Sequence, residues 1–285
     1  MSAAKGMILI MNKKECFYKD KTIIIVGGAG GIGKTIAQQL LKYNSNIVLL
    51  GRDLNKLEIA SKNLSNCHYF SMDITNVENI KNAIDHIESF IGPIDISFNL
   101  AGYDAFAHIQ DISPEDIIKT CRVNFEGSIF YTQYLLKKII PREYGIIANV
   151  NAFSNGLVPF SFYSIDSASR AGVSTFFRSL REELSDEYPR IRFINFSPPI
   201  TDTEAERARI TSQVWERLNF KFHDTEKVVI QILRKISQGK DEIMTFDEKL
   251  LVSLNRVSRK LSRLAFFKKF NKISNIVLKN ADIIN

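Results

Sequence analysis

The 285-residue sequence predicts an α/β fold, in which helices cover both faces of a parallel sheet of about seven strands. Two observations predict this class. Short apolar runs rich in β-branched residues alternate with longer segments of helical periodicity, and a glycine-rich run separates the first such strand from the first helix. Because parallel strands need a crossover connection, each helix is expected to join two strands of one sheet.

The first unit of this pattern runs from Lys21 to Arg52. The strand, glycine turn, helix and second strand are expected at residues 22–26, 27–33, 34–41 and 47–50. Glycines let the backbone approach a pyrophosphate closely, and the free N–H groups at the start of a helix favour an anion. A glycine turn placed between a strand and a helix therefore predicts dinucleotide binding. The alternative is a tight turn without a ligand.

The same alternation continues along the chain. Further strands are expected at residues 68–72, 94–98, 145–150, 191–196 and 242–246. The expected helices cover residues 77–90, 113–140, 164–184 and 225–237, the second with a break near Asn124. Ser113, Pro114 and the two acids that follow give this second helix good capping chemistry. The whole pattern indicates a doubly wound, Rossmann-type fold.

One domain is expected over residues 20–247, after an N-terminal extension at 1–19 and before a helical tail at 248–285. The apolar stretch at residues 7–11 is too short for a signal peptide core, and no stretch reaches the roughly 18 apolar residues that span a bilayer. The three cysteines and four histidines lack the spacing of a disulfide framework or a metal site. A cytoplasmic protein without a bound metal is therefore expected.

The basic character of the chain lies in its tail. Between Lys249 and Ala281 there are nine basic residues and no acidic one, so the rest of the chain carries a net charge of −2. Apolar residues recur here every three or four positions, namely Leu250, Leu254, Val257, Leu261, Leu264, Phe267, Phe270, Ile273 and Val277. A basic amphipathic helix of this kind predicts contact with an anionic membrane surface. Packing against the protein's own core or a second subunit stays open, whereas nucleic acid is not expected, because the apolar stripe is too extensive.

The glycine spacing resembles that of the short-chain dehydrogenase/reductase family. Gly27, Gly31 and Gly33 fit Gly-x-x-x-Gly-x-Gly, with Ile32 between the last two glycines and Val26 where the family usually has Thr. The resemblance covers about residues 20–246 and implies a nicotinamide dinucleotide in the cleft. It further implies contacts to this cofactor from Asp73, Ile74, Asn99, Ala101, Gly102 and Thr203.

The residue that ends the second strand favours NADP(H) over NAD(H). In this family an acidic residue there would hold the ribose hydroxyls of NAD, but the sequence has Gly51-Arg52. A guanidinium group suits a 2′-phosphate through its charge and its bidentate geometry. The alternative is that Arg52 pairs with Asp53 or Glu58 on the surface.

The catalytic group of the family is altered here. The resemblance implies a Ser followed by Tyr-x-x-x-Lys, but the matching string places Asp166 at the Tyr position and Arg170 at the Lys position. Ala152 or Phe153 stands where the Ser belongs, and Ser154 lies one step away. A rival alignment makes Tyr163 the catalytic tyrosine. The candidate catalytic residues are therefore Asn124, which matches the family's relay-water asparagine, with Ser154, Tyr163, Asp166 and Arg170.

Three functions remain open from these residues. In the first, the protein is an oxidoreductase with a noncanonical catalytic set, in which Tyr163 or Ser154 moves the proton. In the second, Asp166 is the base of a non-redox isomerase, dehydratase or cyclase. In the third, the protein is a pseudoenzyme that binds cofactor without turning it over.

The substrate end of the sequence suggests a lipophilic ligand. Ser197-Pro-Pro-Ile-Thr-Asp-Thr203 is similar to a segment of the 3-ketodihydrosphingosine reductase branch, which handles long-chain lipid ketones. Residues 204–222 are expected to form a mobile lid over the cleft. The resemblance also implies a homo-oligomer, either a dimer or a tetramer.

Overall fold

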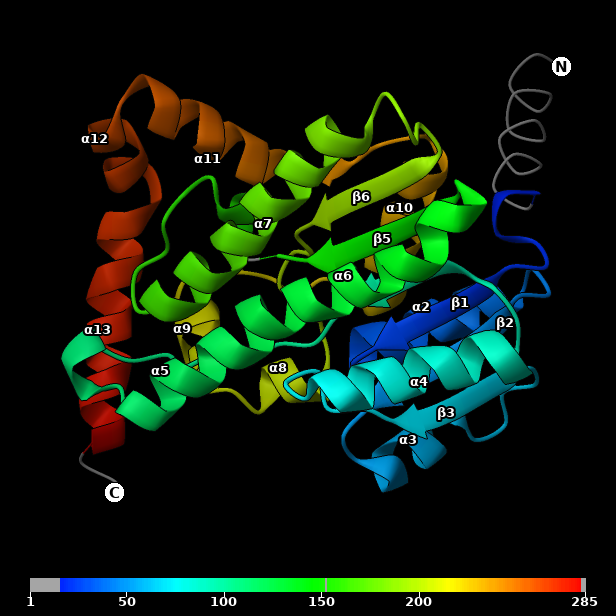
Figure 1. The fold of residues 1–285 in the computed structure, drawn as a ribbon. Coiled ribbons are helices and arrows are strands. Elements are labelled where there is room, and N and C mark those ends of the chain that lie inside the picture. Colours follow the sequence, from blue (N-terminus) through cyan, green and yellow to red (C-terminus); the bar gives the residue numbers. More distant parts are fainter. Residues whose placement is uncertain (1–15, 152, 283–285) are drawn as a thin grey trace, which may run out of the picture.

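The computed structural model describes residues 16–151 and 153–282 and confirms the predicted fold class (Figure 1). Seven parallel strands form one sheet in the order β3-β2-β1-β4-β5-β6-β7. Their bounds are β1 (Thr22–Val26), β2 (Asn46–Gly51), β3 (Cys67–Ser71), β4 (Ile94–Asn99), β5 (Gly145–Val150), β6 (Ile191–Phe196) and β7 (Glu242–Ile243).

Helices cover both faces of this sheet. One face packs against α2 (Gly31–Leu41), α3 (Leu54–Ser61) and α10 (Thr225–Ser237). The other face packs against α4 (Val77–Phe90), α6 (Gly127–Ile139) and α7 (Ser164–Leu184). Successive residues of β1 alternate between the two cores, as the pleat of a strand requires, with Ile23 and Ile25 on one side and Ile24 and Val26 on the other. The sheet is therefore buried on both faces, which explains its continuous apolar strands.

The strand order reverses direction between β1 and β4. From β1 the chain first builds outward to β2 and β3, then crosses back to β4 on the opposite side. In open α/β sheets, ligands bind in the crevice that this reversal leaves at the carboxyl ends of the strands. The glycine turn after β1 lies at this point of the fold.

The break expected near Asn124 is a π-helical turn. The segment η2 (Arg122–Glu126) joins α5 (Pro114–Cys121) to α6 in one continuous rod. Ser113 caps α5 by accepting a hydrogen bond from the N–H of Asp116. A π turn widens the helix by one residue, and such turns are frequent at functional sites.

The last strand is shorter than the sequence indicated. Strand β7 ends at Ile243, so the expectation of a strand up to Phe246 was wrong. Thr245 forms a capping box with Glu248 and begins α11 (Phe246–Val257). The two reciprocal bonds of this box satisfy the first free N–H groups of the helix, which favours helix over strand at this point.

The tail packs against the body of the protein. It continues from α11 through α12 (Arg259–Ser262) and η5 (Arg263–Phe267) to α13 (Lys268–Asp282), which lie together along one side of the domain (Figure 1). Phe270 and Val277 join an aromatic cluster with Phe160 and Trp215. Leu250, Leu254, Val257, Leu261 and Leu264, by contrast, lie outside these buried clusters, and all but Leu254 are exposed. The tail therefore divides into a packed inner face and a solvent-facing outer one.

The segment directly before β1 packs against the core of the domain. Tyr18, which the expected boundary leaves in the N-terminal extension, is fully buried and donates its hydroxyl to the carbonyl of Leu233 at 2.8 Å. Residues 1–15 of that extension lie outside the described residues.

Among the described residues, no helix has the length and hydropathy that crossing a bilayer requires. The same part of the chain gathers no group of three His, Cys, Asp or Glu side chains that could hold a metal ion.

Candidate active site

The glycine turn after β1 forms an anion cradle. Gly27 has a φ of +76°, a backbone conformation that residues with a side chain rarely adopt. Its N–H donates to Leu50 O at 2.8 Å. A Cβ on Gly33 would lie 2.7 Å from Gly27 O, so this contact needs glycine. Helix α2 begins at Gly31 after Gly30, which provides no side-chain cap, and its first turn holds no acidic residue. Its N–H groups are thus left for an anionic ligand such as a pyrophosphate.

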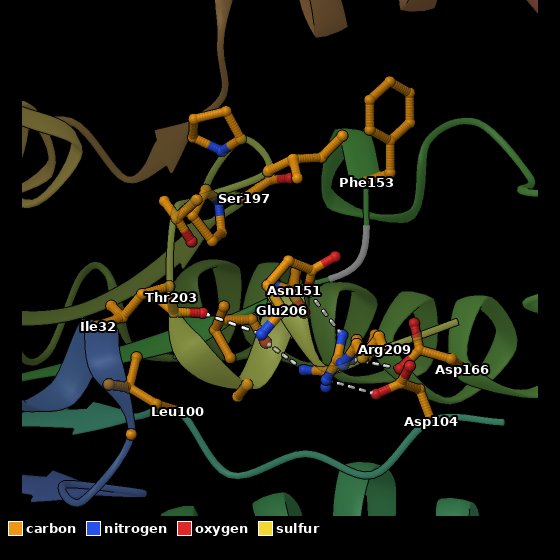
Figure 2. A pocket seen from close by; sticks show the side chains of 18 of the residues that line it. Ile32, Leu100, Asp104, Asn151, Phe153, Asp166, Ser197, Thr203, Glu206 and Arg209 are labelled. Atoms are coloured by element: carbon orange, nitrogen blue, oxygen red, sulfur yellow. Dashed lines mark hydrogen bonds and ion pairs between the residues drawn. The ribbon is translucent and has the colours of Figure 1, made fainter. Parts of the chain in front are cut away.

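A cavity of about 350 Å³ extends from this cradle across the carboxyl ends of the strands. Gly27, Gly31, Ile32 and Gly33 line one end of it. Thr203 lies against the cradle, since a Cβ on Gly31 would come within 2.6 Å of its methyl group. Figure 2 shows side chains from the segments after β4, β5 and β6 around the same space. The cavity thus joins the glycine turn, which suits a phosphate group, to polar and apolar side chains at the strand ends.

The turn after β4 is held by a buried amide. Asn99 donates to Ser128 Oγ and Asn149 Oδ1, both at 2.9 Å, and its own Oδ1 accepts from the N–H of Ala101 at 3.1 Å. These bonds fix the backbone that leads through Leu100, which lines the cavity. Asn99 therefore shapes this wall from behind.

Three residues expected to contact the cofactor, Arg52, Asp73 and Ile74, follow β2 and β3. Arg52 is exposed directly after β2, and among the described residues its guanidinium forms no ion pair, neither with Asp53 nor with Glu58. Asp73 follows β3 and accepts hydrogen bonds from the N–H and hydroxyl of Thr75 at 2.9 and 2.8 Å through a single oxygen. Ile74 is buried beside it. The three residues lie beyond the lining of the cavity, at the neighbouring strand ends.

Asp166 and Arg170 form a mostly buried ion pair in the cavity. Their Oδ1 and Nε atoms lie 2.7 Å apart, and the two side chains are 12% and 13% exposed. Arg170 also donates to Val150 O at 3.1 Å. Gly102 leaves room for this guanidinium, because a Cβ there would lie 2.0 Å from Nη2. The arrangement leaves the carboxylate of Asp166 as a hydrogen-bond acceptor.

Asn124 joins this pair to the opposite wall. It is 2% exposed, and its Nδ2 donates to Asp166 Oδ1 at 3.1 Å and to Tyr103 O at 2.9 Å. Its Oδ1 accepts from the N–H of Tyr103 at 2.8 Å. The π turn presents this amide to the site, so Asn124 does not bond the backbone of its own helix through its side chain. It positions Asp166.

Tyr163 precedes α7 and lines the same cavity. Burial raises the pKa of its phenol above the usual value, and the negative charge of Asp104 acts in the same direction. The phenol therefore keeps its proton throughout the neutral range. It is an available O–H donor and a poor base.

In the segment after β5, the described residues that line the cavity are Asn151 and Phe153, and neither is a serine. Asn151 is buried and donates to Asn195 Oδ1 at 2.6 Å. Ser154 belongs to η4 (Phe153–Gly156), but its side chain lies outside the described part of the structure, as does Ala152.

A charged cluster of the cavity lining comes from residues 204–222, the segment expected as a lid. This segment contains α8 (Glu204–Arg207) and α9 (Thr211–Arg217). Arg209, between them, approaches Asp104 Oδ1 at 2.8 Å and Glu206 Oε2 at 3.1 Å. Figure 2 shows the three side chains turned toward one another beside Asp166. Burial raises the pKa of both Asp104 and Glu206, and the Arg209 charge opposes that rise.

Arg209→Gln should make stability fall more steeply with rising pH. Without the opposing charge, the pKa values of Asp104 and Glu206 rise further above those of the unfolded chain. A carboxyl group with a raised folded pKa favours folding at low pH, and this contribution is lost as the pH rises through the folded pKa. We expect a cost of about 2 kcal/mol at pH 7, since two partly buried charges lose their partner, and a smaller cost at pH 5.

Urea unfolding of both forms at pH 5 and pH 7 measures this difference. The matched control is Arg207→Gln, because the partner of Arg207, Asp202, is exposed and its pKa is lowered rather than raised. A pH dependence in Arg209→Gln parallel to that of the unmodified protein would show that the cluster does not hold the lid.

The far end of the cavity is aromatic. Phe153, Phe160, Tyr163 and Trp215 line it. Phe160 packs in turn against Phe270 of the tail, with ring centroids 4.8 Å apart, and Trp215 lies 5.3 Å from the same ring. The tail therefore supports the wall of the substrate end.

Several lining residues carry no motif that sequence reasoning could detect. Asp104, Asn151, Glu206 and Arg209 come from turns and from residues 204–222. These residues come together only because the carboxyl ends of neighbouring strands lie side by side in the folded sheet. One signal was present: Asp104 follows the Asn99–Gly102 turn by two residues, at the carboxyl end of a strand.

Comparison with known proteins identifies the family. The model of the short chain dehydrogenase family matches residues 21–213. A human 3-oxoacyl-[acyl-carrier-protein] reductase is 26% identical over 176 residues, which cover 61% of this chain and 74% of that protein. An uncharacterised oxidoreductase of Staphylococcus epidermidis is 29% identical over 186 residues, which cover 65% and 80% respectively.

Solved structures share the fold. A short chain dehydrogenase from Bacillus anthracis superposes with a TM-score of 0.70 at 24% identity, covering 81% of this chain and 96% of that one. An actinorhodin polyketide ketoreductase variant solved with NADPH also gives 0.70, at 20% identity, covering 80% and 96%. The family match spans the sheet from β1 to β6 and most of the lid, including the glycine cradle and the Asp166–Arg170 pair. The chain belongs to the short-chain dehydrogenase family.

Proposed function

We propose that this family member is an NADP(H)-dependent oxidoreductase that interconverts a lipophilic carbonyl compound and its alcohol. One observation carries the proposal: a single cavity joins the glycine cradle to an aromatic end and holds Tyr163, Asp166 and Arg170 between them. The family binds nicotinamide cofactors, and when bound such a cofactor supplies or accepts the hydride.

The residues of the chain have separate roles in this proposal. The N–H groups at the start of α2 hold the pyrophosphate, and Thr203, which lies against Gly31, contacts the cofactor as well. Arg170 contacts the cofactor ribose while its ion pair with Asp166 fixes its orientation. Tyr163 donates a proton to the carbonyl oxygen during reduction. The phenol carries its proton at neutral pH, but burial raises its pKa and makes it a weaker acid, so its position in the cavity carries this role.

Asp166 as a base in a non-redox reaction is the second candidate. Its carboxylate lines the cavity and is held by Arg170 and Asn124 as an acceptor, which is the arrangement a base requires. The first candidate predicts that replacing Tyr163 lowers the activity most, whereas the second predicts that replacing Asp166 does.

Arg52→Glu should abolish the preference for NADPH over NADH. A guanidinium bonded to a 2′-phosphate contributes about 1.5–3 kcal/mol, so NADPH affinity should fall by about 10- to 100-fold while NADH affinity is retained or rises. Fluorescence titration with each nucleotide measures both constants. Lys56→Glu is the matched control, since Lys56 is an exposed cation four residues further along. Equal affinities in the unmodified protein would contradict the role of Arg52.

A lipophilic substrate is supported by the aromatic end of the cavity. Phe153, Phe160 and Trp215 offer apolar surface and no charge there. The names of two similar proteins, an acyl-carrier-protein reductase and a polyketide ketoreductase, refer to carbonyl groups on carbon chains. The 3-ketodihydrosphingosine resemblance agrees with the same class of substrate.

We further propose a homo-oligomer in the cytoplasm that can associate with an anionic membrane. Ile118, Phe125 and Phe130, exposed on α5, η2 and α6, supply an apolar face for a second copy. Val257 and Leu264, which are 80% and 57% exposed, supply apolar contacts for a membrane beside the basic residues of the tail. Sedimentation and vesicle flotation of the full chain test the two contacts separately.

A further inference from the structure

A second cavity of about 630 Å³ lies between the start of α7 and the tail. One side comes from the segment that leads into α7, and the other from α11, α12, η5 and α13. It shares only Phe160 and Ser167 with the lining of the catalytic cavity, so the two spaces stand on opposite sides of a common wall.

The tail side of this groove is cationic. Arg259 and Arg263 both line it and stand four residues apart, so their side chains share one face of the helical segment. Neither forms an ion pair within the described residues. Two guanidinium groups on one face can hold a phosphate or a carboxylate through charge and paired hydrogen bonds.

Unpartnered polar atoms lie in the same place. Ser167 Oγ and Asn271 Oδ1 belong to residues that line the groove, and both atoms are buried without a hydrogen-bond partner in the described structure. Buried polar atoms are almost always satisfied, so these two residues hold unused hydrogen-bonding capacity beside the groove.

The opposite side of the groove is apolar. Val158, Pro159 and Phe160 form most of it with Ala168 and Ala171 of α7, beside Ser161, Ser164 and Ser167, and Phe267 adds an aromatic ring from the tail side. An inorganic anion would make no use of these groups, whereas an alkyl chain would bury surface against them.

We propose that this groove binds an anionic amphiphile. Its phosphate or carboxylate head lies between Arg259 and Arg263, and its alkyl chain lies along Phe160 and Phe267. This site is separate from the cofactor cleft, and its occupancy does not depend on hydride transfer.

Calorimetric titration of the full-length protein with dodecyl phosphate tests the site. All concentrations stay below micelle formation. We expect Arg259→Gln/Arg263→Gln to weaken binding by at least about tenfold, as expected for lost charge-assisted bonds. The matched control is Lys268→Gln/Lys272→Gln, which removes two exposed charges of the same tail that do not line the groove and should change affinity less than about twofold. Thermal unfolding of each variant confirms that it is folded.

Three further probes define the ligand. Dodecanol should bind at least about tenfold more weakly than dodecyl phosphate, because it lacks the charge. Hexyl phosphate and inorganic phosphate should also bind more weakly, because they lack the longer chain. Equal losses in both double variants would overturn the proposal and indicate general charge attraction. Inorganic phosphate that binds as tightly as dodecyl phosphate, or binding only to phosphatidylserine vesicles and not to the monomeric amphiphile, would overturn it as well.

Discussion

Tyr163→Phe should lower kcat for the NADPH-dependent reduction of a long-chain ketone by about 100- to 10,000-fold, the usual contribution of a positioned general acid. Tyr163 lines the cavity with Asp166, and its phenol is protonated at neutral pH, since burial raises a pKa that is already high. Phenylalanine keeps the ring and its packing on Phe106 and Phe160, so the change removes the hydroxyl alone. Cofactor affinity should remain within about twofold, since the hydroxyl is not needed for binding in this account.

Steady-state kinetics with two further variants complete this test. Tyr134→Phe is the matched control, because Tyr134 lies on α6 and its hydroxyl donates to Asp85 of α4, and neither residue lines the cavity. Asp166→Asn keeps the shape of the side chain and should reduce kcat by less than about tenfold, since Asp166 orients Arg170 rather than moving the proton. Full activity in Tyr163→Phe together with loss in Asp166→Asn would show that Asp166 rather than Tyr163 moves the proton. Absence of ketone reduction in all three forms, with cofactor still bound, would favour the non-redox candidate.

Phe270→Ala should destabilise the protein by about 3–5 kcal/mol. Phe270 is fully buried and contacts Phe160, Trp215 and Phe266, at ring-centroid distances of 4.8, 5.3 and 5.6 Å. The large cavity left by alanine lies directly behind the substrate wall. The variant should therefore also weaken substrate binding, because Phe160 and Trp215 lose their support.

Urea unfolding measures the stability change, with Leu264→Ala as the matched control. Leu264 is 57% exposed on the same tail, so its truncation should cost no more than about 0.5 kcal/mol. Equal, small effects of the two substitutions would mean that the tail does not pack on the domain in solution. Because the inner face of the tail belongs to the core, deletion of residues 249–285 would remove both faces at once, and point substitutions separate them.

The parts of the fold that depend on local chemistry could be predicted from the sequence. The apolar runs of β1 and β2, rich in β-branched residues, indicate strands buried on both faces, and the glycines at 27, 31 and 33 indicate a turn before a helix. The strong cap at Ser113 fixed the start of α5 for the same reason. Asp166 and Arg170, four apart on one helix, form the ion pair that their spacing indicates.

The remaining features depend on tertiary contacts. An amphipathic tail shows that one face seeks apolar surroundings, but lipid and a protein core satisfy the same periodicity. Phe270 packs in the core rather than against lipid, because the fold places Trp215 and Phe160 beside it. Similarly, Arg209 meets Asp104 because the lid folds back over β4, across about a hundred residues of chain that no local pattern encodes. Strand β7 was predicted too long because the capping box at Thr245 competes with an apolar residue pattern.

The most direct test of the account is deuterium transfer from 4-deuterated NADPH to a long-chain ketone, followed by mass spectrometry of the alcohol. We expect the unmodified protein to produce the deuterated alcohol and Tyr163→Phe to produce almost none, while both bind NADPH. If the unmodified protein binds NADPH tightly but transfers no label to any ketone of a panel of chain lengths, the assignment of hydride transfer to this cavity is contradicted.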